Sequence, residues 1–372
     1  MSAAGPSQGA NSAPAGGSEA AELANEAASV GAHTHARVRV GIAGLGRMGR
    51  RHAENLARRV PNAELVAACD PSKDELDWAT RQLGVSNAYA DYATMLAQPD
   101  IEAVFLVTPT TLHAQQIVAA LRARKHVFSE KPLSLDLAEC RRVEAEAALQ
   151  PDLKVMIGFV RRFDTHYRHA HARIRQGHIG RPLMVRSHTL DKHDPSGYFV
   201  RYSESSGGMF VDMSVHDIDT ARWLLGMPAP ARAFATGLVG VHEGLREFRD
   251  IDNGVATCEF STGEIATIYA SRTMAHGFEA ITEVIGTEGR ITVGGDARLD
   301  HVVIADAHGV RHECTPTFYE RFEDAFLRED IEFVQAVLDD RAPPLTLRDA
   351  TEATRIALAF RESLLERRIV SL

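Results

Sequence analysis

The sequence predicts a two-domain α/β protein: an N-terminal doubly wound parallel sheet, followed by a C-terminal α+β domain with a large, mostly antiparallel open sheet. Three observations predict this fold class. Residues 38–157 alternate between short apolar runs and helical stretches, which is typical of βαβ units. A glycine-rich turn separates the first run from the first helix. In the second half, short strand-like runs follow one another with glycine-bearing turns, which favours antiparallel pairing.

Length and composition agree with two globular domains. The chain has 372 residues, of which 45% are hydrophobic and 24% charged, and its formal net charge is −9. At roughly 100–200 residues per domain, this length predicts about two domains. The excess of acidic residues argues against a surface for nucleic acid or an anionic membrane. No apolar run approaches the ~18 residues that span a bilayer, which excludes an integral membrane protein.

Residues 1–36 differ from the rest of the chain. They are rich in alanine, glycine and serine and contain neither lysine nor arginine. This composition fits neither a secretory signal nor a transit peptide, so we expect a disordered tail.

The cysteines are too far apart for a zinc cluster or a disulfide framework. We therefore expect reduced core thiols, no metal site and a reducing compartment, the cytoplasm. The four positions are Cys69, Cys140, Cys258 and Cys314.

The apolar pattern predicts the elements of the first half in order. Strands are expected at 38–43, 64–69, 103–107 and 126–128, and helices at 50–59, 73–83 and 111–123. The order of elements changes after Gly158, so we expect a nucleotide-binding domain over 37–157 and a second domain over 158–372.

The glycine-rich turn has the pattern Gly44-x-Gly46-x-x-Gly49. It follows a predicted strand and precedes a predicted helix, which is the context that a dinucleotide-binding Rossmann fold requires. Gly44 permits a tight turn, Gly46 lets the backbone approach a pyrophosphate, and Gly49 allows close packing of helix on strand. Free N–H groups at the start of the helix favour the phosphate charge.

Asp70 bears on the choice of cofactor. It ends the second strand, about 20 residues after Gly49, where a carboxylate accepts hydrogen bonds from ribose hydroxyls and repels a 2′-phosphate. This favours NAD over NADP, although Arg47 or Lys73 would pair with a phosphate. The alternative is that Asp70 is only a helix N-cap. Thr108 ends a further strand and is expected at the same crevice, unless it belongs to an ordinary loop.

Glu130-Lys131-Pro132 follows the next strand. The proline restricts the backbone of Lys131, and the bond between them is a candidate cis peptide. An ammonium at the crevice would hydrogen-bond a hydroxyl and stabilise the developing alkoxide. The alternative is a lysine that simply pairs with Glu130.

A second group of polar residues lies about eighty residues further on. Asp212 and His216 are four apart and Asp219 follows, in one predicted helix that Gly207-Gly208 opens and Gly226 closes. A histidine that accepts a proton near neutral pH suits the oxidation of an alcohol. The alternative is a capped surface helix with incidental charges.

The remaining runs of the second half predict an open sheet with helices on one side. Strands are expected at 183–189, 231–241, 253–260, 264–274, 279–285 and 289–293, and helices at 164–176, 319–339 and 346–366.

These motifs, together with Gly158-Phe-Val-Arg161-Arg162-Phe163-Asp164, resemble those of the Gfo/Idh/MocA oxidoreductase family. The resemblance covers the chain from Val38 to its C-terminus. It implies NAD-dependent oxidation of a cyclic polyol or sugar hydroxyl to a ketone, with myo-inositol as the expected substrate. It also implies a homodimer or homotetramer that forms through the second sheet. The alternatives are dehydrogenation of another sugar or of scyllo-inositol, NAD-dependent glycoside cleavage, and a non-catalytic dinucleotide sensor.

The resemblance also implies roles for individual residues. Lys131, Asp212 and His216 would be catalytic, with His216 as the general base. The segment 271–279 would reach into the pocket with His276 or Phe278. Cofactor contacts are expected at Gly44, Gly46, Arg47, Met48, Gly49, Asp70, Thr108, Glu130 and Lys131. Substrate contacts are expected at Lys131, Arg161, Asp212, His216, Asp219 and His276.

Overall fold

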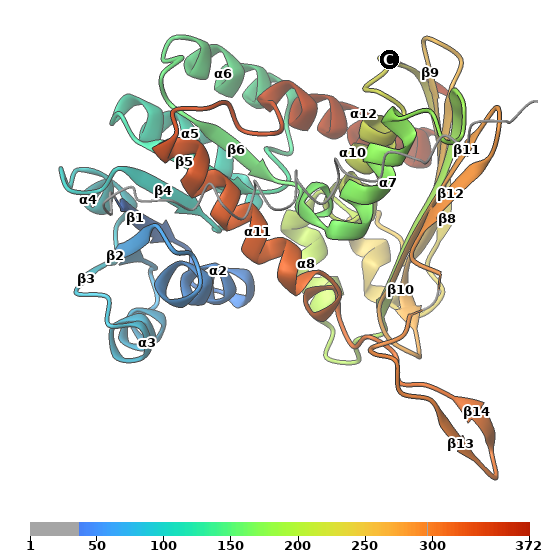
Figure 1. Ribbon diagram of the computed structural model, residues 1–372, viewed down its shortest axis with the longest axis horizontal. Helices are drawn as coiled ribbons and strands as arrows, with labels where there is room; N and C mark the ends of the chain where they lie inside the picture. Colours follow the sequence, from blue (N-terminus) through green and yellow to red (C-terminus); the bar gives the residue numbers. More distant parts are fainter. Residues whose placement is uncertain (1–36, 296) are drawn as a thin grey trace, which may run out of the picture. The chain divides into compact units, whose positions relative to one another are not determined.

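The computed structural model describes residues 37–295 and 297–372, so the tail expected at 1–36 lies outside the described residues. These residues form two large sheets with their helices and one small hairpin (Figure 1). No helix in the described part of the chain is long and apolar enough to cross a membrane. All four cysteines are free thiols.

The first sheet has the strand order β3-β2-β1-β4-β5-β6, and every pair in it is parallel. This is the order of a doubly wound dinucleotide-binding sheet, and it confirms the predicted Rossmann architecture. The strands are β1 (Val38–Ala43), β2 (Ala63–Cys69), β3 (Asn87–Tyr89), β4 (Ala103–Leu106), β5 (His126–Glu130) and β6 (Val155–Gly158). The helices are α2 (Arg47–Arg58), α3 (Lys73–Leu83), α4 (Tyr92–Leu96), α5 (Thr110–Arg122) and α6 (Leu137–Ala148).

The second sheet has the order β12-β11-β7-β10-β9-β8-β15. Its one parallel pair is β7 with β10, so the sheet is mostly antiparallel, as predicted. The strands are β7 (Pro182–Lys192), β8 (Pro230–Leu238), β9 (Asn253–Phe260), β10 (Ile265–Met274), β11 (Glu279–Gly286), β12 (Arg290–Val293) and β15 (Val370–Ser371). A separate hairpin, not predicted, joins β13 (Ile304–Asp306) to β14 (Gly309–Arg311).

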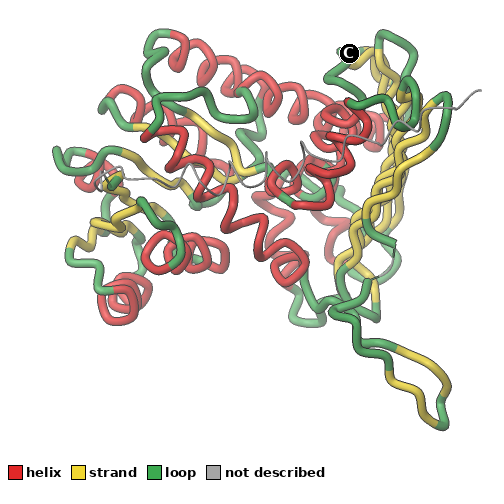
Figure 2. Tube along the Cα trace, viewed as in Figure 1, coloured by secondary structure: helices red, strands yellow, loops and turns green. Residues whose placement is uncertain are grey.

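The described helices of the second half lie on one face of this sheet (Figures 1 and 2). Helix α11 also packs against α2 and β1 of the first sheet, and α12 packs against α6 and β6. The C-terminal helices therefore connect the two halves. They are α7 (Thr165–Arg175), α8 (Tyr198–Ser206), α9 (Met209–Asp212), α10 (Val215–Leu224), α11 (Phe318–Leu338) and α12 (Leu347–Glu366).

The single helix predicted across Asp212, His216 and Asp219 is wrong, because the chain forms two helices, α9 and α10, at this point. In a continuous helix the carbonyl of Asp212 would accept from the N–H of His216. Here the N–H of His216 points to the carbonyl of Met213 at 3.4 Å, and the carbonyl of Asp212 accepts from Lys131 instead. A contact with the other half of the protein thus replaces a helical hydrogen bond.

Candidate active site

The glycine turn between β1 and α2 has the shape that the sequence predicts. Gly44 has φ +88°, and a Cβ there would lie 2.4 Å from the carbonyl oxygen of Val107. A Cβ on Gly49 would lie 1.9 Å from the carbonyl oxygen of Gly44. A Cβ on Gly46 would meet nothing within 4 Å. Two of the glycines are therefore needed to close the turn, and the third leaves open space in front of it.

Asp70 joins the end of β2 to this turn. Its Oδ2 accepts from the N–H of Leu45 at 2.8 Å, and its Oδ1 accepts from the N–H of Ser72 at 2.8 Å. The N-cap of α3 is Ser72, whose side chain accepts from Glu75, so the alternative reading of Asp70 as a cap is wrong. No side chain caps the start of α2. The turn, this helix start and the Asp70 carboxylate fit the pyrophosphate and ribose of a dinucleotide.

Three other predicted cofactor residues surround the turn. The guanidinium of Arg47 lies 5.1 Å from the ring centres of both Tyr198 and Phe318. Met48 is half-buried against the core. Thr108 follows β4 and donates its hydroxyl to Gln116 at 2.5 Å. Arg47 therefore reaches the second half of the chain, whereas Thr108 is held by α5.

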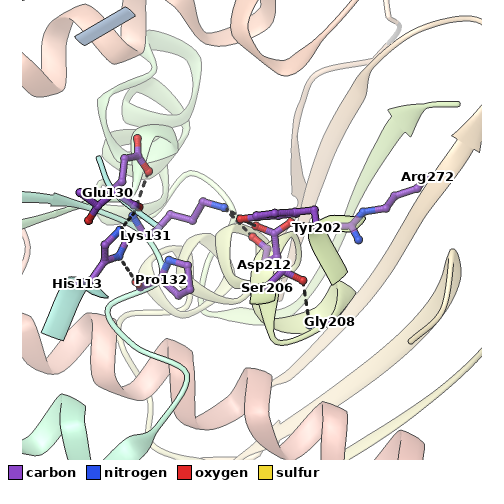
Figure 3. Close-up of polar contacts among 10 residues, drawn as sticks. His113, Glu130, Lys131, Pro132, Tyr202, Ser206, Gly208, Asp212 and Arg272 are labelled. Atoms are coloured by element: carbon purple, nitrogen blue, oxygen red, sulfur yellow. Dashed lines mark hydrogen bonds and ion pairs between the residues drawn. The ribbon is translucent and has the colours of Figure 1, made fainter. Parts of the chain in front are cut away.

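Lys131 follows β5, and its bond to Pro132 is a cis peptide, as the sequence suggested. Its Nζ donates to the carbonyl oxygen of Asp212 at 2.7 Å and lies 3.2 Å from Oδ1 of the same residue (Figure 3). The carboxylate of Glu130 instead accepts from the backbone N–H of Lys131 at 3.0 Å. The alternative in which the Lys131 ammonium pairs with Glu130 is therefore wrong.

Asp212 is the centre of the polar cluster in Figure 3. The hydroxyl of Tyr202 donates to its Oδ1 at 3.2 Å, and Nη2 of Arg272 donates to its Oδ2 at 2.6 Å. Burial alone would raise the pKa of Asp212, but the charges of Lys131 and Arg272 outweigh it and hold this pKa below its ordinary value. Asp212 is thus an anion between two cations.

His216 lies near the start of α10 and is half-buried. Burial, reinforced by the positive charges of Lys131 and Arg161, lowers the pKa of His216 well below its ordinary value. Within residues 37–295 and 297–372, its buried Nδ1 has no hydrogen-bond partner, and no hydrogen bond joins the ring to Asp212. The imidazole is therefore neutral, which is the state that a general base requires.

Two residues that the sequence assigned to substrate are buried in ion pairs. The 3₁₀ turn η1 (Val160–Phe163) carries Arg161 and Arg162, and α10 carries Asp217 and Asp219. Arg161 donates to Asp217 at 2.7 Å, and Arg162 donates to both oxygens of Asp219 at 2.8 and 2.6 Å. Both carboxylates are fully buried. These pairs fix α10, and Arg161 acts on His216 through its charge.

His276 lies apart from this cluster. Its Nε2 is 3.5 Å from Glu279, which also accepts from His188 at 2.7 Å. His188 is on the face of β7 opposite to Ser187, whose hydroxyl donates to Asp217 of α10. His276 is therefore held toward the helix-free face of the sheet. Phe278, in contrast, is buried against the rings of Phe318 and Phe322.

The cluster also contains residues that the sequence analysis did not assign. Arg272 lies within the segment 271–279, which the sequence did place near the pocket. Asp191 of β7 is close enough to Arg272 and Asp212 for their charges to affect its pKa. Burial is the largest influence and raises this pKa to about 6. Tyr202 belongs to α8, a short helix of nine residues that the sequence analysis did not predict. A charged residue inside the strand expected at 264–274 is a signal that could have singled out Arg272, whereas Asp191 lies beyond the strand expected at 183–189.

A dinucleotide-binding sheet together with an ammonium, a carboxylate and a neutral imidazole is the arrangement expected of a nucleotide-dependent oxidoreductase. The chain belongs to the Gfo/Idh/MocA oxidoreductase family: its NAD-binding Rossmann-fold model matches residues 38–159, and its C-terminal alpha/beta-domain model matches residues 171–372. The protein is thus an oxidoreductase with NAD as its cofactor.

The chain matches individual relatives over nearly their whole length. The chain is 36% identical to scyllo-inositol 2-dehydrogenase (NAD(+)) of Bacillus subtilis, over 88% of this chain and 94% of that protein. It is 35% identical to myo-inositol 2-dehydrogenase of Thermotoga maritima, over 90% of this chain and 98% of that protein. The crystal structure of scyllo-inositol dehydrogenase from Lactobacillus casei with NAD(H) and scyllo-inositol matches with a TM-score of 0.87 and 37% identity, over 90% of this chain and 99% of that one.

Proposed function

We propose that this protein oxidises one ring hydroxyl of an inositol to a ketone with NAD, and that myo-inositol, which gives scyllo-inosose, is the substrate. One observation carries the proposal. The ammonium of Lys131 contacts Asp212, and its positive charge helps to lower the pKa of the nearby His216, which is therefore neutral. The names of the relatives from Bacillus subtilis and Thermotoga maritima support an inositol as the substrate.

The residues of the cluster have separate tasks. His216, neutral because of its burial, accepts the hydroxyl proton. Lys131 donates to the same oxygen and stabilises its negative charge, and Asp212 holds the ammonium in place. When bound, NAD would supply the hydride acceptor for the carbon that bears this hydroxyl. Gly46, the start of α2 and Asp70 would hold the cofactor.

Scyllo-inositol is a second candidate substrate. The relatives with 36% and 37% identity are both scyllo-inositol dehydrogenases, whereas the myo-inositol enzyme is 35% identical. The two isomers differ in the orientation of one hydroxyl, so the same lysine and histidine would serve either substrate.

A substrate panel tests the proposal. The protein is assayed with myo-inositol, scyllo-inositol, glucose and a glycoside, each with NAD and with NADP, and NADH absorbance is recorded. We expect net NADH with an inositol. Glycoside cleavage without net NADH indicates a glycosidase, and tight NADH binding without turnover of any compound indicates a sensor. Either result contradicts the proposal.

We propose a homodimer or homotetramer that forms through the helix-free face of the second sheet, in the cytoplasm. Phe234, Val255 and Tyr269 are exposed on neighbouring strands of this face, and Val255 pairs with Tyr269. The free cysteines agree with a reducing compartment. The nucleotide domain would span 37–157 and the substrate and assembly domain 158–372. Light scattering of the whole chain, compared with Val255→Glu, tests the assembly.

A further inference from the structure

A buried group of charged side chains includes Glu130, the residue that precedes Lys131. His52, on α2, has its Nδ1 2.7 Å from Oδ1 of Asp330 and its Nε2 3.1 Å from Oε1 of Glu130. We propose that His52 is a positioning residue for Lys131: a doubly protonated imidazolium that links Asp330 of α11 to Glu130 and thereby fixes the main chain of Lys131. The proposal rests on the proposed function, in which Lys131 acts on the substrate oxygen.

With both carboxyl groups ionised, this geometry places a proton on each ring nitrogen of His52. Both nitrogens face carboxylate oxygens, and an ionised carboxylate only accepts hydrogen bonds. Burial alone would lower the pKa of His52, but Asp330 and then Glu130 outweigh it and raise this pKa well above its ordinary value. The side chains of His52 and Asp330 are fully buried, so water does not screen the interaction.

Asp330 holds the ring from the side of α11. Its second oxygen, Oδ2, accepts from Nδ2 of Asn55 at 3.0 Å, so one carboxylate receives donors from two positions of α2. The ring of His52 also packs against Phe128 of β5 and Phe326 of α11, with ring centres 5.3 and 5.9 Å away. These contacts hold the imidazole with its Nε2 toward Glu130.

Glu130 transmits this orientation to Lys131. Its Oε1 accepts from His52 and its Oε2 accepts from the N–H of Lys131 at 3.0 Å. Lys131 is thus held at two points, its backbone by Glu130 and its ammonium by Asp212. Loss of the first contact would displace the second, and small displacements of catalytic groups cost large factors in rate.

Glu329, next to Asp330 on α11, is a natural control. It is equally buried, but neither of its carboxyl oxygens has a hydrogen-bond partner among the described residues. Burial, with the nearby charge of Glu130, raises the pKa of Glu329 well above its ordinary value, so it is a neutral acid. Ligand atoms of His52, Glu130 and Glu329 lie within 4.8 Å of one another, which is close enough for a cation. A cation, however, would need an unprotonated Nε2, whereas the Nε2–H of His52 donates to Glu130.

Neutron diffraction of deuterated wild-type crystals tests the protonation directly. We expect deuterons on both nitrogens of His52 and on the carboxyl group of Glu329. A single deuteron on the ring, or a stoichiometric divalent metal in the purified protein, overturns the proposal. This measurement does not depend on the identity of the substrate, so it stands even if inositol is not oxidised.

The matched variants Asp330→Asn and Glu329→Gln test the positioning role. For Asp330→Asn we expect kcat to fall by about tenfold or more, the isotope effect of inositol deuterated at the reacting carbon to change, and the NADH Kd to stay within about twofold. Crystals of this variant should show a displaced Lys131. Glu329→Gln, which mimics a neutral acid, should match the wild type in all of these. Equal losses in both variants, or an unchanged kcat and Lys131 position in Asp330→Asn, overturn the proposal.

Discussion

Arg272 Nη2 lies 2.6 Å from Asp212 Oδ2, and Lys131 contacts the other oxygen of the same carboxylate. The two cations come from different halves of the chain, because Arg272 belongs to β10 and Lys131 follows β5. Arg272 is 1% exposed, and its guanidinium lies 4.9 Å from the ring centre of Phe199. The ionisation of Asp212 is therefore favoured by Lys131 and by a residue of the second sheet, Arg272.

Replacement of Arg272 should change the acid side of the pH profile. Arg272 lowers the pKa of Asp212, so Arg272→Gln raises this pKa and lets the carboxyl protonate at a higher pH. We expect kcat/KM to begin its fall at a higher pH than in the wild type. Arg272→Lys keeps the charge and should restore part of the profile. Superimposable profiles for wild type and Arg272→Gln would contradict this prediction.

Replacement of Lys131 should separate catalysis from cofactor binding. Lys131→Met keeps most of the stem but removes the ammonium, so we expect kcat to fall by about a thousandfold while the NADH Kd changes by less than about threefold. Steady-state kinetics and NADH fluorescence titration measure the two quantities. Lys154→Met, at a lysine that pairs with Asp340 instead, is the control and should keep wild-type activity. Full activity in Lys131→Met would exclude the proposed mechanism.

His216 should remain a competent base in mildly acidic solution. Burial lowers its pKa, and a base acts in its unprotonated form, so its contribution is complete above the folded pKa and lost only when the pH falls below it. We expect no loss of kcat/KM from His216 near its ordinary pKa of 6.5. His216→Gln should lower kcat by about a hundredfold or more. A limb centred at the ordinary histidine pKa that disappears in this variant would show that the ring is not buried as described.

Asp70 should determine the preference for NAD. Asp70→Ser removes the charge that repels a 2′-phosphate, and with it the acceptor for the N–H of Leu45. We expect weaker NAD binding and a ratio of kcat/KM for NADP over NAD that rises by about tenfold or more. Kinetics with both cofactors at fixed substrate give the ratio. An unchanged ratio would mean that other residues select the cofactor.

Asp219 should matter for stability and not for substrate affinity. Asp219→Asn leaves the buried Arg162 without its main partner, which costs about 3–5 kcal/mol in comparable buried pairs. Urea unfolding measures this loss, and the KM should stay close to that of the wild type. Glu259→Gln, at an exposed pair with Arg232, is the control, with an expected loss of about 0–1 kcal/mol. A large rise in KM without destabilisation would restore Asp219 as a substrate ligand.

Local sequence patterns were sufficient to predict those strands and helices whose bounds depend on residues close together in the chain. The strands Val38–Ala43 and Asn253–Phe260 have the predicted bounds, since apolar residues and turn residues mark both ends. Helix α6 was missed because only Cys140 and Val143 of its residues are buried, which leaves little apolar period to read. The interpretation of Asp70 as a ribose contact depends on its distance from the glycine turn and stays a prediction, while the structure joins Asp70 to that turn through the N–H of Leu45.

Motifs of fixed spacing were enough to predict the family and to single out Lys131, Asp212 and His216, and the apolar runs with their turns predicted the two kinds of sheet. The partner of each charge, in contrast, is visible only in the folded chain. Sixty residues separate Asp212 from Arg272, and 278 separate His52 from Asp330. Such pairs depend on strand register and helix packing, and these are set by burial over the whole chain, so no local pattern encodes them.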